Sequence, residues 1–143
     1  ECKIVVTSLI EELVSEDGVG IRRQWRYLDL RLMSHLRTLR IGDNCYPRVD
    51  GFMATGMKCL ETVYIGKNSF TIPGLRQIET TDRSFFLEDC PNVKELKIGY
   101  HSFCDYAFCQ LHVLPALEVL EIGDMLENER HGCFTQAAVE LES

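Results

Sequence analysis

Apolar residues recur along this chain in a pattern that repeats four times. Each copy has the form L-x-x-L-x-I-G, with valine in place of one leucine in two of the copies. The copies end at glycines 42, 66, 99 and 123, so that two intervals are 24 residues and the middle one is 33. Apolar and polar residues alternate within each copy. This alternation predicts four short strands, near residues 37–41, 61–65, 94–98 and 118–122.

The connections between these strands are too long for tight hairpins. The four strands are therefore predicted to be parallel and to lie in one sheet in chain order. One unit cannot bury its own apolar residues, whereas stacked units bury them as a continuous core, which predicts a repeat solenoid. Two buried columns are expected, and their members are Leu39, Val63, Leu96 and Leu120, and Ile41, Ile65, Ile98 and Ile122.

The match between units extends beyond the glycines. Tyr46, Phe70 and Phe103 each follow their glycine by four residues. Upstream, apolar residues precede the first leucine or its equivalent by nine, six and three residues in two units: Tyr27, Leu30 and Met33, and Phe108, Leu111 and Leu114. These residues are interpreted as additional core anchors at fixed positions in the repeat.

The motif L-x-x-L-x-I-x-x-N-x-[FY] on a 24-residue period resembles the leucine-rich repeat family, and residues 60–70 match it position by position. The recurring I-G-x-x-[SC]-[FY] is similar to repeats of large protist and bacterial leucine-rich proteins. The resemblance covers about residues 25–143 and implies an α/β fold, a right-handed leucine-rich repeat solenoid with one parallel sheet and a mostly irregular convex side. It implies that Asn44 and Asn68 bond the backbone of the bend. His101 and Met125 stand at the asparagine position, so this ladder is expected to break in the second half.

The chain is predicted to be a single domain, residues 1–143, with a degenerate unit at 1–24 that contains a strand around Ile4 and Val6. Repeats begin near residues 36, 60, 93 and 117, and the last one is truncated, which favours a segment of a longer array. Insertions at 72–84 and 124–132 break the period. Insertions in solenoids map to loops on one face, and they are interpreted either as tolerated surface insertions, which the low cost of lengthening a loop favours, or as functional loops.

Charge excludes two classes of partner. The chain has 15 basic and 22 acidic residues, a net charge of −7, and its last 43 residues carry one basic and eight acidic groups. An acidic chain without a basic stripe is a poor ligand for nucleic acid or for anionic membrane surfaces. No apolar run approaches the roughly 20 residues that a membrane-spanning helix needs, so no membrane insertion is expected.

The seven cysteines form no C-x-x-C motif and are odd in number. They favour free thiols in a reducing compartment, and hence a cytoplasmic location, with the cell surface as the alternative. His101, Cys104, Cys109 and His112 include zinc-type ligands, but their spacing matches no strong zinc motif, so no metal and no cofactor is expected. No known catalytic motif is present, and the chain is predicted not to be an enzyme.

The polar positions of the strands provide the candidate site. Three outward rows are expected, and their members are Arg37, Glu61, Lys94 and Glu118; Thr38, Thr62, Glu95 and Val119; and Arg40, Tyr64, Lys97 and Glu121. One interpretation is a charge ladder that keeps an exposed sheet soluble. The other is a protein-binding surface, because tyrosine and arginine are enriched in binding hot spots.

The predicted function is a leucine-rich repeat module for protein–protein interaction, with a structural spacer in a longer protein as the alternative. The predicted contact residues are Arg40, Tyr64, Lys97 and Glu121, with the loop residues Asp124, Glu127 and Glu129. The acidic loop favours a partner with a basic surface. Deleting the loop and measuring retention of a partner would discriminate between the two functions.

Overall fold

The structure is a computed structural model, and it describes residues 9–21, 26–72, 82–123, 132–134 and 137–142. Within these ranges the structure has ten strands and no helix. The strands are β1 (Glu12–Ser15), β2 (Tyr27–Asp29), β3 (Thr38–Ile41), β4 (Gly51–Thr55), β5 (Thr62–Ile65), β6 (Ser84–Glu88), β7 (Glu95–Ile98), β8 (Phe108–His112), β9 (Val119–Ile122) and β10 (Ala138–Glu142).

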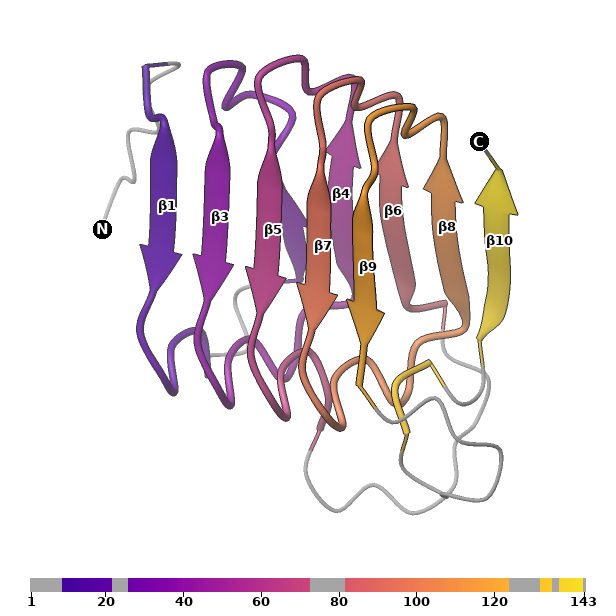
Figure 1. The fold of residues 1–143 in the computed structure, drawn as a ribbon. Coiled ribbons are helices and arrows are strands. Elements are labelled where there is room, and N and C mark those ends of the chain that lie inside the picture. Colours follow the sequence, from indigo (N-terminus) through magenta and orange to yellow (C-terminus); the bar gives the residue numbers. More distant parts are fainter. Residues whose placement is uncertain (1–8, 22–25, 73–81, 124–131, 135–136, 143) are drawn as a thin grey trace.

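Consecutive strands alternate between two five-stranded parallel sheets. One sheet has the order β1-β3-β5-β7-β9 and the other has the order β2-β4-β6-β8-β10. Figure 1 shows the two sheets facing each other, with the odd-numbered strands in front. Each turn of the chain thus adds one strand to each sheet, and the molecule is a parallel β-solenoid.

The four strands predicted from the repeat are confirmed as β3, β5, β7 and β9. They are parallel, they lie in one sheet in chain order, and equivalent repeat positions are paired in register. The sequence did not indicate β1, which pairs with β3 at the edge of the same sheet. The strand expected around Ile4 and Val6 lies outside the described residues.

The irregular convex side was a wrong expectation, because the second sheet occupies it. In β4 and β6 alternate side chains are buried in the core: Phe52 and Ala54, and Phe85 and Leu87, with Gly51 at the start of β4 buried as well. This period of two is the signature of a strand with one buried face. The α/β class is likewise not what the described part of the chain shows, since its regular elements are all strands.

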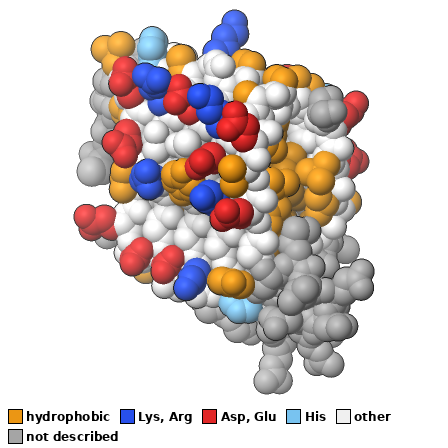
Figure 2. Space-filling model, viewed as in Figure 1, with side chains coloured by type: hydrophobic (Ala, Val, Ile, Leu, Met, Phe, Trp, Pro, Cys, Tyr) orange, Lys and Arg blue, Asp and Glu red, His pale blue; other side chains and the backbone are white. Residues whose placement is uncertain are grey.

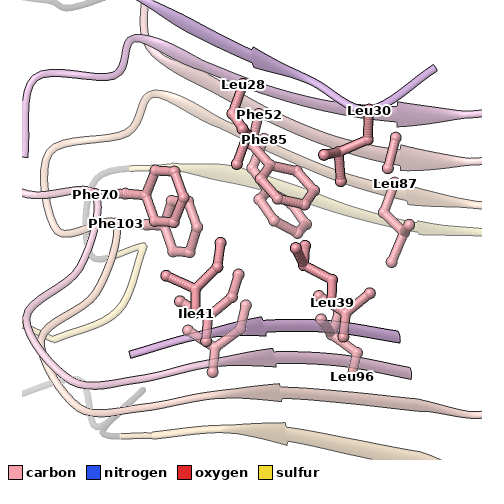
Figure 3. Packing of buried hydrophobic residues seen from close by; sticks show 14 of the residues in the cluster. Leu28, Leu30, Leu39, Ile41, Phe52, Phe70, Phe85, Leu87, Leu96 and Phe103 are labelled. Atoms are coloured by element: carbon pink, nitrogen blue, oxygen red, sulfur yellow. The ribbon is translucent and has the colours of Figure 1, made fainter. Parts of the chain in front are cut away.

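Both predicted core columns are present as far as β7, whereas their last members on β9 are less buried, with Ile122 half-buried. Leu39, Val63 and Leu96 are fully buried, and Ile41, Ile65 and Ile98 are nearly so. Figure 3 shows Leu39 and Leu96 aligned between the sheets. Leu120, the last member of the leucine column, is 40% exposed, because β9 is an edge strand with a neighbour on one side only.

The aromatic residues that follow the glycines form a second ladder inside the solenoid. Phe70 and Phe103 stack with ring centroids 4.6 Å apart, and Phe103 and Phe134 stack at 5.0 Å (Figure 3 labels the first pair). Tyr46 extends the stack at 5.5 Å from Phe70. All four residues have a positive φ between 51° and 57°. The stacking thus accompanies a left-handed turn that is repeated in each unit, a conformation that costs energy for a side chain of this size.

A serine–cysteine ladder joins the turns beside this aromatic stack. Ser69 Oγ donates to the Gly42 carbonyl at 2.9 Å, and Ser102 Oγ donates to the Gly66 carbonyl at 2.7 Å. The thiols of Cys45 and Cys133 make the equivalent contacts, each at 3.1 Å, to the carbonyls of Glu16 and Gly99. This ladder satisfies carbonyls at the turns that would otherwise be costly to bury.

Asparagine has a different role from the one implied by the family resemblance. Asn44 and Asn68 adopt φ of 56° and 53°, and it is their backbone N–H groups that donate to the next turn, each at 2.8 Å. His101 takes the same left-handed conformation, with φ of 58°. The expected break at His101 therefore does not occur in the backbone, because the position requires a left-handed residue and asparagine is one of several that accept it.

Candidate functional site

The outward face of the β1-β3-β5-β7-β9 sheet carries the predicted rows. Arg40, Tyr64, Lys97 and Glu121 are opposite one another in register on four neighbouring strands. Each is at least partly exposed, because alternate residues of these strands point away from the core. Figure 2 shows charged side chains of both signs crossing this face in rows. The structure thus brings the four predicted strand residues together.

Tyr64 is the centre of this row. The Arg40 guanidinium carbon lies 4.8 Å from its ring centroid and Lys97 Nζ lies 5.7 Å from it, so that the ring has a cation from each neighbouring strand. Its hydroxyl donates a hydrogen bond to the Glu95 carboxylate, and that bond raises the pKa of Tyr64. The ring is therefore oriented by contacts on several sides.

Ion pairs also link neighbouring strands around Tyr64. Arg37 Nη2 lies 2.8 Å from Glu61 Oε1, and this contact lowers the pKa of Glu61 and raises that of Arg37. Lys97 Nζ and Glu121 Oε1 are 3.8 Å apart. These contacts fit the charge-ladder interpretation, in which cross-strand pairs of opposite charge stabilise an exposed sheet.

A row of glycines crosses the same face next to Tyr64. A Cβ atom built on Gly66 would lie 2.6 Å from the Gly42 carbonyl carbon, and one on Gly99 would lie 2.7 Å from that of Gly66. Successive turns therefore approach too closely for a side chain here. Figure 2 shows a pale band across this face that is almost free of coloured side chains. The repeated glycine is required for turn stacking, and it leaves a smooth strip on the surface.

An open depression of about 780 Å³ follows this strip. Arg40, Tyr64 and Lys97 line one side, and Lys67 and Tyr100 line the other. Lys67 Nζ lies 5.9 Å from the Tyr100 ring centroid. Glu121 and Leu120 also line the depression, which we call the glycine groove. The sequence patterns did not reveal it.

The acidic loop is the remaining part of the predicted site. Asp124, Glu127 and Glu129 lie outside the described residues. Within the predicted insertion the structure describes Gly132, which is buried just before Cys133. The structure therefore brings the strand residues of the predicted site together and leaves the loop part as a prediction.

The four zinc-type ligands have separate roles in the described structure. Cys109 points into the core and is 1% exposed, whereas His112 Nε2 lies 2.8 Å from a Glu142 carboxylate oxygen. The Cys104 thiol donates to the His101 carbonyl at 3.1 Å. No group of three or more His, Cys, Asp or Glu side chains that could hold a metal gathers among the residues described.

The described cysteines form no disulfides, and they are Cys45, Cys59, Cys90, Cys104, Cys109 and Cys133. Burial raises the pKa of the Cys109 thiol to about 12 and also raises that of Cys90. Such thiols stay protonated and unreactive at neutral pH, because the thiolate is the nucleophile. Cys2 lies outside the described residues.

A buried ionic cluster lies where three successive turns enter the second sheet, and sequence reasoning missed it. Arg83, with its side chain 4% exposed, pairs with the equally buried Asp105. Its Nη2 donates to the carbonyls of Pro47 and Val49, both at 2.8 Å, and its guanidinium lies 4.9 Å from the Tyr106 ring. Burial raises the pKa of Asp105, and the charge of Arg83 opposes this shift. These contacts join the turns from within, so the cluster is a structural feature.

Comparison with known proteins gave no match to a family model, to a curated protein or to a solved structure. The class that the fold defines is thus the parallel β-solenoid with two strands per turn. In the described part of the chain no helix has the length and apolar character needed to cross a membrane.

Proposed function

We propose that this chain is a protein-interaction module that binds a partner protein across the outward face of its β1-β3-β5-β7-β9 sheet. The observation that carries the proposal is the row Arg40, Tyr64 and Lys97 beside the glycine groove. A smooth groove accepts an extended polypeptide without steric conflict. Its rims supply the residue types that dominate binding energy at protein interfaces.

The proposal includes membership of the leucine-rich repeat class and no catalytic activity. The L-x-x-L-x-I strands and the 24-residue period support this relationship. The second sheet and the serine–cysteine ladder are departures from the family pattern. A reducing compartment such as the cytoplasm is proposed for the protein, because its described cysteines form no disulfides.

The alternative function is a structural spacer, and a specific observation favours it. Arg40 and Lys97 contact Tyr64, and Arg37 contacts Glu61, so several outward side chains already have partners within the chain. In a spacer these contacts only stabilise the sheet. In a binding module a partner protein contacts the exposed edge of Tyr64 and replaces ion-pair contacts with its own charges.

The test is capture of a partner by the intact chain, followed by quantitative binding to variants. Arg40→Ala, Tyr64→Ala and Lys97→Ala together should raise the dissociation constant of the captured partner at least about tenfold. The matched control substitutes outward residues of the other sheet, with Met53→Ala, Glu88→Ala and Gln110→Ala, and should bind like the wild type. If the control variant bound the partner more weakly than the wild type and the first variant did not, this choice of face would be wrong.

A further inference from the structure

The floor of the glycine groove has no unused backbone hydrogen-bonding group at Gly42, Gly66 and Gly99. Their N–H groups donate at 2.8 Å to carbonyls of the preceding turn, which belong to Ser15, Ile41 and Ile65. Their carbonyls accept from the serine–cysteine ladder at 2.7 to 3.1 Å, and these donors are Ser69, Ser102 and Cys133. The Asp43 carboxylate beside Gly66 is likewise engaged, because its Oδ1 accepts from the Lys67 N–H at 2.8 Å. A polypeptide on this floor therefore finds no free backbone group of these glycines with which to pair, unlike a strand that adds to a sheet.

The rims of the groove supply hydrogen-bond donors instead. Among the described residues that line it, the charged ones are the cations Arg40, Lys67 and Lys97 and the anion Glu121. Lys97 Nζ lies 3.8 Å from Glu121 Oε1, and Arg40 Nε lies 3.9 Å from Glu12 Oε1. Both are long contacts between well-exposed groups and are weak, so they leave the two cations able to bind a ligand. Because arginine and lysine side chains carry donors and no acceptor, the groove is rich in donors and poor in acceptors.

A ligand that suits such a groove carries acceptors and few donors. An ordinary extended polypeptide has an N–H at every residue, and those turned toward the floor would be buried without an acceptor, which is costly. Proline has no N–H and keeps its carbonyl. A proline-rich chain in the polyproline II conformation has no internal hydrogen bonds, so its carbonyls are free to accept from Arg40, Lys67 and Lys97. Aromatic side chains, here Tyr64 and Tyr100, line the grooves that recognise this conformation.

The spacing of the strands fits the repeat of this conformation. The groove crosses the strands, and Arg40 on β3 and Lys97 on β7 are two strands apart with Tyr64 of β5 between them. Adjacent strands are about 4.8 Å apart, so the two cations are separated by about 9.6 Å along the groove. A polyproline II helix has three residues per turn and advances about 9.3 Å in each turn. Side chains at positions i and i+3 on one edge of the helix therefore lie opposite Arg40 and Lys97, where carboxylates would pair with both.

We propose that the glycine groove binds an acidic, proline-rich segment of a partner protein in the polyproline II conformation, with repeats of the form Glu-Pro-Pro. The glutamates pair with Arg40 and Lys97, and the prolines lie on the glycine floor and against the Tyr64 ring. This inference rests on the proposed function, because it names the chemistry of the partner at the same site. The basic surface expected from the acidic loop belongs to a different part of that partner.

A fluorescent peptide, (Glu-Pro-Pro)4, is the probe for this chemistry. The intact chain should bind it in an anisotropy titration with a dissociation constant below about 1 mM. The peptide (Lys-Pro-Pro)4 reverses the charge, and (Glu-Gly-Ser)4 keeps the charge without proline; each should bind at least about tenfold more weakly. The chain has a net charge of −7, so non-specific attraction would favour the lysine peptide. The opposite preference therefore requires a local cationic site.

Variants of the intact chain locate the peptide on the molecule. Arg40→Glu with Lys97→Glu should weaken binding of (Glu-Pro-Pro)4 at least about tenfold and make (Lys-Pro-Pro)4 the tighter ligand. The matched control is Arg26→Glu with Arg31→Glu, which makes the same change in net charge at exposed positions on either side of β2. It should change the affinity by less than about twofold. Urea unfolding of both variants checks that the fold is retained, and the reversed preference cannot arise from a folding defect.

Three outcomes would overturn the inference. They are no binding of (Glu-Pro-Pro)4 at about 1 mM, equal affinity for the proline and glycine peptides, and equal weakening by the groove variant and its control. A captured partner separates this inference from the proposed function. If Arg40→Ala, Tyr64→Ala and Lys97→Ala together weaken that partner but (Glu-Pro-Pro)4 does not displace it, the face is right and the ligand chemistry is wrong. If the partner is insensitive to the triple variant, the proposed function is wrong, and the peptide titrations still decide the chemistry of the groove.

Discussion

Leu96→Ala should destabilise the chain strongly, because Leu96 is fully buried in the middle of its column. It lies on β7, with Val63 of β5 on one side and Leu120 of β9 on the other. The substitution removes three carbon atoms, each worth about 0.8 kcal/mol when buried. The turns on both sides are held by the stacked aromatics and the serine–cysteine ladder, so the cavity cannot collapse fully. We expect a loss of about 3–4 kcal/mol in the free energy of unfolding.

Leu120→Ala is the matched control, because it makes the same change in the same column at the edge. Leu120 is 40% exposed, so the transfer contribution falls to about 1.5 kcal/mol, and water fills the space. Both variants would be measured by urea unfolding, monitored by circular dichroism, with the slope compared to the wild type. A loss under about 1 kcal/mol for Leu96→Ala would refute the assignment of that residue to the core. Equal losses for the two variants would show that the edge is covered.

Three further predictions concern stacking, thiols and charge. Gly66→Ala should lower the free energy of unfolding by about 1–3 kcal/mol in urea titrations, because its Cβ would contact the Gly42 backbone. Alkylation in denaturant without reductant should label all seven cysteines in mass spectra, and two missing labels would contradict a reducing compartment. In the native chain at pH 8 Cys109 should stay unlabelled, because burial raises the pKa of its thiol. Partner binding to the glycine-groove face should weaken with added salt, since exposed charges are screened over about 8 Å at physiological ionic strength, and Asp124→Asn with Glu127→Gln should mainly slow association.

The repeat was sufficient to predict the front sheet. The L-x-x-L-x-I-G pattern has period two within each strand and a regular spacing between strands. Register and burial of Leu39, Val63 and Leu96 followed from it. The pattern could not predict the exposure of Leu120. Exposure depends on whether a strand lies next to β9, and the alternation within β9 carries no information about that strand.

The second sheet was missed because two of the upstream anchors were assigned to the wrong face, whereas Leu30, Met33, Leu111 and Leu114 are buried as expected. Tyr27 and Phe108 were interpreted as core anchors, but they are 61% and 49% exposed and point outward. In β8 the inward residues are Cys109 and Leu111, which are two residues apart. Cys109 is a small apolar residue of the core, and a single cysteine in a sequence gives little indication of the buried face of a strand. The same three-residue spacing of apolar positions in two units showed that the unit repeats. It did not show whether those positions lie in a strand.

The glycine groove and the Arg83 cluster could not be predicted for a related reason. Each depends on atoms from different turns that come within a few ångströms of each other. Gly66 is adjacent to Gly42 only because the intervening 23 residues complete one turn of the solenoid. Arg83 meets the carbonyls of Pro47 and Val49 across 34 to 36 residues of sequence. Such contacts can be predicted from a sequence only when it is already known which turns stack on each other.

The features that hold the turns together are mostly distinct from the side chains proposed to bind partners, and the close-packed glycines belong to both because they also form the floor of the groove. The stacked aromatics, the serine–cysteine ladder and the close-packed glycines all lie at turn or inward positions, and they fix the separation between neighbouring strands. The outward rows contribute little to this separation, so substitutions such as Lys97→Ala can change charge at the surface while the core stacking is retained. Recognition would then be set by residues that the repeat leaves free to vary, which is why a motif that defines the fold so clearly gives so little information about the partner.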